Sequence, residues 1–187
     1  STLREWDLQV EKGRGEAATP YGHYDGGPKQ PPQVYLPDEL REELDFDYII
    51  AGAHWLLGVS ISDTEAVIRD WYEQQMCIVT HPHVDVLVHP WLWSTAILEP
   101  EIKELGLPWL YDFSVIPRSM HDELAAAARE HNTAVEISAI SYFGPLDGLS
   151  TGQPDAVIPT QPRKQYVEFH HLLKDAGVKL SIGSDSH

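Results

Sequence analysis

The chain has 187 residues, of which 42% are hydrophobic, and this is enough for one globular domain with its own core. Its formal net charge of −16 disfavours binding to long nucleic acids, whose phosphates require lysine and arginine. It has no apolar run long enough to span a membrane, and its single cysteine excludes an intramolecular disulfide, so we expect a cytoplasmic protein.

Segments rich in valine and isoleucine alternate with helical patterns, which is typical of repeated β/α units around a parallel sheet. Strands are predicted at 2–10, 47–54, 84–90, 133–138 and 178–183, the first of them from the weakest pattern. Helices are predicted at 37–44, 62–76, 119–131 and 162–177. Long loops are predicted at 11–36, 90–118 and 143–161, with a short helix at 100–105.

Three of these helices carry recognisable start or stop signals. Ser62 followed by Glu65 matches a capping box, and Ser119 is expected to cap the next helix. Pro162 suits the first turn of the last helix, and Gly177 suits its end. The segments that connect the later strands are therefore expected to be helical crossovers.

Potential metal ligands stand at the ends of three predicted strands. His54 ends "DYIIAGAH", His89 follows "DVLV", and Asp185 and His187 follow "LSIG". In β/α barrels the chemistry gathers at the carboxyl ends of the strands, so these side chains are expected to converge on one point. Imidazole and carboxylate ligands without thiolate suit zinc, manganese or iron, and the mixture is typical of hydrolytic sites with several metals.

His81 and His83 form an H-x-H pair that looks like a metal motif. They precede their strand, so they are expected at the opposite face of a barrel and not among the ligands. His170 and His171 are expected to be structural, and His23 and His121 have no partner visible in the sequence. Glu136, inside "AVEIS", either orients a ligand or is a satisfied polar residue of the barrel, and the second interpretation is preferred.

The segments "IIAGAH", "VDVLVHP", "AVEIS" and "LSIGSDSH", in this order and at these separations, resemble the later motifs of the PHP family, named after polymerase and histidinol phosphatase. The resemblance spans nearly the whole chain, loosely in the three loops. It implies a distorted barrel of seven β/α units with up to three metal ions at the carboxyl ends of the strands. Members of this family mostly hydrolyse phosphomonoesters or phosphodiesters.

The resemblance also implies roles for individual residues. Glu5, in "LREWDL", matches the family's early strand-end glutamate and would bridge two metal ions. His54 and His89 would complete the first metal site, Asp185 would bind the second ion and His187 the third.

The chain departs from the family at its start, because the H-x-H motif that opens the family pattern is not present upstream of Glu5. About five of the seven β/α units are expected within residues 1–187. We therefore expect a single PHP-like barrel domain, of the α/β class, that is truncated at both ends and inactive as this piece alone. A natural variant that has lost the early motifs is the alternative.

The function implied is that of a metal-dependent phosphoesterase, in which a metal-activated hydroxide attacks a small phosphorylated substrate. A metal-dependent amidohydrolase is the first alternative, although no lysine stands at a strand end to form a carbamylated ligand. A catalytically inactive PHP-like interaction domain is the second. Residues considered for the pocket are Trp55, Trp91 and Trp93, with core packing as the alternative, and Arg118 and Arg163 for the substrate phosphate.

Overall fold

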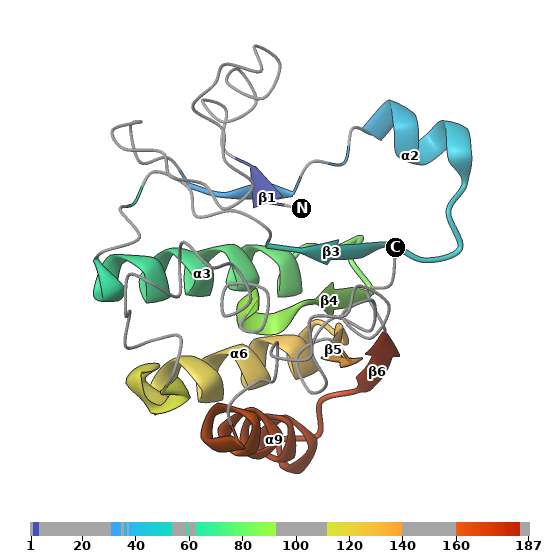
Figure 1. Ribbon diagram of the computed structural model, residues 1–187. Coiled ribbons are helices and arrows are strands. Elements are labelled where there is room, and N and C mark those ends of the chain that lie inside the picture. The colour runs from blue at the N-terminus through green and yellow to red at the C-terminus, as the bar shows by residue number, and fades with distance from the viewer. Residues whose placement is uncertain are drawn as a thin grey trace, which may run out of the picture.

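The computed structural model of the protein describes residues 2–3, 31–34, 36, 38–53, 59, 63–92, 112–139 and 160–183. A parallel sheet and three long helices make up most of this part of the chain (Figure 1). The strands are β1 (Thr2–Leu3), β2 (Gln33–Val34), β3 (Ile50–Gly52), β4 (Val86–Val88), β5 (Ala134–Ser138) and β6 (Leu180–Gly183). The helices are α2 (Asp38–Leu44), α3 (Thr64–Val79), α6 (Arg118–Glu130) and α9 (Thr160–Asp175).

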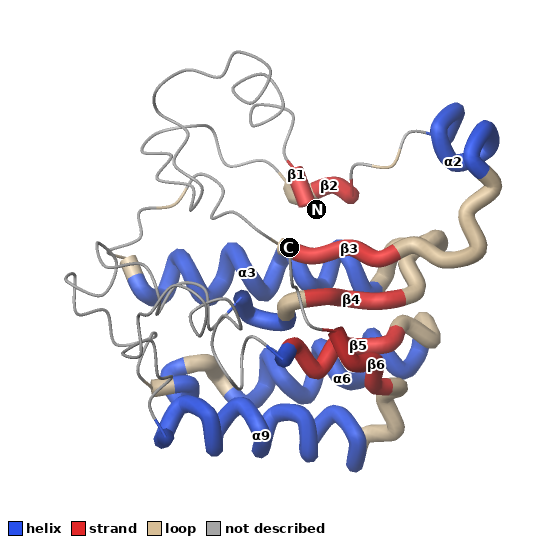
Figure 2. The backbone as a smooth tube through the Cα atoms, turned by 45° about the vertical axis from the view of Figure 1, so that its right-hand side comes forward, coloured by secondary structure: helices blue, strands red, loops and turns tan. Residues whose placement is uncertain are grey.

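Four parallel strands form one sheet in the order β3-β4-β5-β6, which is also their order along the chain. This confirms the α/β class and four of the predicted strands, although β3 and β4 are shorter than predicted. The helices α3, α6 and α9 cover one face of this sheet, and each packs against the next (Figure 2). No helix in the described ranges has the length and hydropathy needed to cross a bilayer.

The sheet buries one face against the helices. The strand register places Ala51, Leu87 and Val135 side by side in one row, and all three are almost fully buried. The next row, Ile50, Val86 and Ala134, points to the other face and is less buried, because side chains alternate along a strand. Glu136 lies on this second face, since it follows Val135.

The first strand differs from the expectation. Thr2–Leu3 pairs antiparallel with Gln33–Val34 in a separate two-stranded sheet, so β1 does not extend the parallel sheet within the described residues. Both short strands contact helix α3. A weak apolar pattern in the sequence does not determine which strand is the pairing partner, because β pairing depends on packing against neighbours.

Two helix starts also differ from the prediction. Asp63 caps α3, with its carboxylate accepting a hydrogen bond from the Ala66 N–H at 3.0 Å, while Ser62 lies outside the described residues. Helix α6 starts at Arg118 after Pro117 and has no side-chain cap, so Ser119 is already inside the helix. The end of α9 follows the prediction, because Gly177 adopts the positive φ of 82° that favours glycine.

An aromatic cluster packs the helix layer against the end of β4. Trp91, Phe113 and Phe169 surround the imidazole of His121, with ring centroids 5.0–5.3 Å from it. His121 is 7% exposed, and burial, together with the charge of Arg118, lowers its pKa to about 4. Trp91 is therefore a core residue, which is one of the two roles considered for it.

His121 is expected to destabilise the fold as the pH falls from about 6.5 to about 4. Its pKa is lower in the folded chain than its ordinary value of 6.5, so the unfolded chain takes up the proton first. The shift from 6.5 to about 4 corresponds to on the order of 3 kcal/mol at the acid end of this range. Denaturant unfolding of wild type and His121→Phe at several pH values measures it. The variant should lose less stability on acidification, and parallel curves would contradict the expectation.

Candidate functional site

Only one of the five predicted metal ligands, His89, lies in the described part of the chain. The other four, Glu5, His54, Asp185 and His187, lie outside the described residues. The strands that lead to four of the five predicted ligands are nevertheless described: β3, β4 and β6 are parallel strands of one sheet. Their carboxyl ends therefore lie at the same edge of the sheet, as the sequence predicted.

His81 and His83 lie at the other end of β4. The His83 N–H donates to Nδ1 of His81 at 3.3 Å, so this H-x-H pair interacts with itself before the strand begins. Burial lowers the pKa of His81, and the neighbouring His83 lowers it further. The two imidazoles and His89 are thus separated by the whole of β4 (Val86–Val88).

The chain turns sharply where β4 ends. His89 has a φ of 50° and Trp91 a φ of 65°, with Pro90 between them. Residues other than glycine rarely adopt this left-handed region, and each such residue costs about 1–3 kcal/mol. Such a backbone persists only where its surroundings hold it, so the contacts around this turn determine where the His89 side chain lies after β4.

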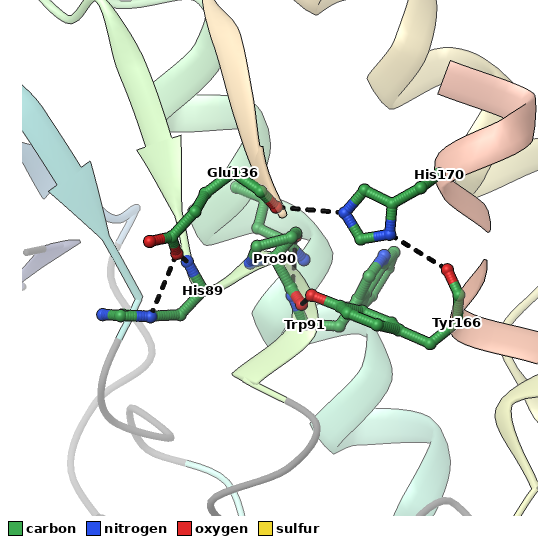
Figure 3. A network of polar contacts seen from close by, with 7 residues as sticks. His89, Pro90, Trp91, Glu136, Tyr166 and His170 are labelled. Carbon is green, nitrogen blue, oxygen red and sulfur yellow. Dashed lines mark hydrogen bonds and ion pairs between the residues drawn. The ribbon is translucent and has the colours of Figure 1, made fainter. Parts of the chain in front are cut away.

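Glu136 reaches from β5 to this turn (Figure 3). Its Oε2 accepts a hydrogen bond from the His89 backbone N–H at 2.9 Å and lies 3.3 Å from Nδ1 of the His89 ring. The side chains of His89 and Glu136 are only 11% and 6% exposed. One carboxylate oxygen therefore fixes both the backbone and the ring of His89.

The carboxylate of Glu136 also lies against β6. A Cβ atom placed on Gly183 would lie 1.8 Å from Oε1 of Glu136, which is far below a permissible contact. Glycine at position 183 therefore leaves the space that the carboxylate occupies. From the middle of β5, Glu136 thus contacts the carboxyl ends of both neighbouring strands, β4 and β6.

Glu136 is held in the ionised form. Burial by itself would raise the pKa of Glu136, but the contact with the His89 ring, the hydrogen bond from the His89 backbone N–H and the charge interactions of His89 and His170 lower it overall below its ordinary value. The backbone of Glu136 is fixed from the other side of the sheet, because a ring nitrogen of His170 lies 3.0 Å from its carbonyl oxygen. His170 is accordingly structural, as expected.

This arrangement determines which nitrogen of His89 can bind a cation. A carboxylate beside Nδ1 favours the tautomer that carries its proton on Nδ1, and the lone pair is then on Nε2. Nε2 points away from Glu136 (Figure 3). The same carboxylate–histidine pairing orients imidazole ligands in many metal sites.

The positions of the other residues considered for the site add little to the geometry around His89. Arg118 is exposed and forms an ion pair with Asp122 on its own helix, at 2.9 Å. Arg163 lies in the first turns of α9, while Trp55 and Trp93 lie outside the described residues. Within the ranges that the structure describes, no three or more His, Cys, Asp or Glu side chains are grouped closely enough to hold a metal ion.

Two roles were considered for Glu136, that of a residue orienting a ligand and the preferred one of a satisfied polar residue. The structure places its carboxylate on the backbone and ring of His89, a contact that fits both roles. Gly183 could have given a signal, because a glycine near the end of a strand often marks a close approach by another group. Comparisons of the chain with protein-family models, with curated proteins and with solved structures gave no match.

Proposed function

We propose that the protein is a metal-dependent phosphoesterase of the PHP type, acting on a small phosphorylated substrate. The observation that carries the proposal is the buried contact between Glu136 and His89 at the carboxyl end of β4. Two features accompany this contact, a carboxylate beside Nδ1 of His89 and a left-handed backbone at His89. Both features are expected where Nε2 must point at a bound cation.

The fold supports a barrel. In doubly wound sheets the strand order reverses and helices cover both faces, whereas here the strands follow chain order and α3, α6 and α9 lie on one face. Within the described residues β3 and β6 are the edges of the sheet, and they expose Ile50 and Ile182 by 55% and 86%. We propose that these strands belong to an incomplete, distorted (β/α)7 barrel of about five units, in which Glu136 points inward.

The proposed ligands are His89 together with Glu5, His54, Asp185 and His187. Nitrogen and carboxylate donors without thiolate fit zinc, manganese or iron, and up to three ions are proposed for the complete domain. Bound cations would supply an activated hydroxide and offset charge on the phosphoryl oxygens. His89 contributes the Nε2 lone pair, and Glu136 holds the Nδ1 proton and the ring orientation.

Metal removal tests this function. The full-length gene product should hydrolyse p-nitrophenyl phosphate, lose this activity on dialysis against a chelator, and regain it with zinc, manganese or iron. Stoichiometric metal with hydrolysis of an amide or lactam substrate instead would favour the amidohydrolase alternative. Absence of both bound metal and chelator-sensitive hydrolysis would favour an inactive interaction domain and contradict the proposal.

A further inference from the structure

Two helices of the outer layer hold the turn that carries His89. The hydroxyl of Tyr166, on α9, donates to the carbonyl oxygen of Pro90 at 3.1 Å. The N–H of Trp91 donates to Oε1 of Gln75, on α3, at 3.0 Å. The two side chains that bind the turn are fully buried, with exposed fractions of 0% for Tyr166 and 1% for Gln75.

Gln75 is itself fixed in place. Its Nε2 donates to the carbonyl oxygen of Trp71 one helical turn earlier, at 3.2 Å, so the amide orientation that presents Oε1 to Trp91 is determined. A glutamine buried in an apolar helix interface is costly unless its polar atoms are satisfied. The interaction with the Trp91 N–H therefore accounts for a polar residue at this position.

Helix α9 fixes both halves of the His89–Glu136 contact. Tyr166 binds the chain just after His89, and His170, one turn later on the same helix face, lies against the carbonyl oxygen of Glu136. Nδ1 of His170 lies 3.0 Å from the Tyr166 carbonyl oxygen, and the two rings pack with centroids 4.7 Å apart (Figure 3). The end of β4 and the middle of β5 are thus held by neighbouring side chains of one helix.

These contacts are needed because the turn is strained. His89 and Trp91 both have positive φ, and such a backbone persists only where its surroundings hold it. Loss of either contact allows the turn to relax toward ordinary φ values. Such relaxation moves the His89 backbone, and with it the ring that Glu136 orients.

We propose that Tyr166 and Gln75 are positioning residues for His89, which they hold through the backbone of the Pro90–Trp91 turn. This role rests on the proposed metal-dependent function. It assigns part of the cation affinity to buried side chains of α3 and α9 that bind the backbone of the turn. Tyr166 and Gln75 are expected to act together, since they hold adjacent residues of one turn.

The test compares Tyr166→Phe and Gln75→Met with matched controls in the full-length protein. Tyr72→Phe removes an exposed hydrogen bond from a tyrosine hydroxyl to Glu123, between α3 and α6. Gln74→Met removes an amide that donates to Asp70 within α3. Amide hydrogen exchange at His89 and Trp91 reports on the turn. The dissociation constant for zinc, from competition with a chromophoric chelator, reports on the site.

We expect both test variants to speed exchange at His89 and Trp91 by at least about tenfold and to weaken zinc binding by about tenfold, the lower end of the range for residues that support metal ligands. The controls should do neither. Faster exchange with an unchanged zinc affinity, or equal effects in test and control variants, would overturn the positioning role. Wild-type protein that binds no zinc would instead contradict the proposed function, and the positioning role would fall with it.

Discussion

Replacement of His89 by alanine is expected to reduce phosphoesterase activity of the full-length protein by more than about 100-fold. Mutation of a residue that only supports a metal ligand already lowers metal affinity or activity by about 10–100-fold, and His89 is proposed as a ligand itself. The backbone N–H that binds Glu136 remains in the variant, so the turn keeps one of its contacts. Initial rates with p-nitrophenyl phosphate at saturating metal measure the effect.

His81→Ala is the control for strand polarity. His81 and His89 flank the same short strand, and both are only partly exposed. Only the histidine at the carboxyl end is expected in the site, so His81→Ala should keep most of the activity. If both variants lose activity equally, the assignment of function to the carboxyl end of the sheet is wrong.

Replacement of Glu136 by glutamine is expected to weaken metal binding by about 10–100-fold while the chain still folds. Glutamine has nearly the same shape and can still accept a hydrogen bond from the His89 N–H, but it lacks the negative charge that holds the Nδ1 proton of His89. Calorimetric titration of the metal-free protein with zinc measures the change. Glu168→Gln, at an exposed position of α9, makes the same change in net charge and should leave the affinity intact.

Gly183→Ala tests the same contact from β6. The new Cβ would overlap Oε1 of Glu136, so the carboxylate has to move away from His89. Metal affinity should fall as it does in Glu136→Gln. Gly177→Ala is the comparison, because it places alanine at a φ of 82° and costs about 1 kcal/mol of stability. Gly177 precedes β6 and is therefore at the other end of this strand from Gly183. Unchanged zinc binding in both Glu136→Gln and Gly183→Ala would show that the contact does not serve a metal.

The alternation of apolar strands and amphipathic helices predicted the parallel sheet, because burial of one face constrains every strand in the same way. Strand polarity also predicted that His81 and His89 lie at opposite ends of β4, as they do in the structure. Local signals were less reliable at the helix starts. Asp63 rather than the predicted Ser62 provides the side-chain cap of α3, and Pro117 precedes α6, since neighbouring capping residues compete and the loop geometry selects among them.

The contact of Glu136 with His89 could not be predicted from the sequence. Alternation along β5 places the Glu136 side chain on the other face of the sheet from Val135. Which group its carboxylate contacts, however, depends on how the chain turns after β4. That turn uses positive φ at His89 and Trp91, neither of which is glycine, so no residue type signals it. The hydrogen bonds of Gln75 and Tyr166 that hold the turn join residues 16 and 76 positions apart.

Metal content of the purified full-length protein tests the central proposal most directly. Elemental analysis of wild type, Glu136→Gln and His89→Ala, each prepared in the presence of zinc and then desalted, gives the ions bound per chain. We predict stoichiometric metal in the wild type, up to three ions per chain, and clearly less in both variants. Wild-type protein with no bound metal, or variants with the full wild-type content, would contradict a metal centre built on His89.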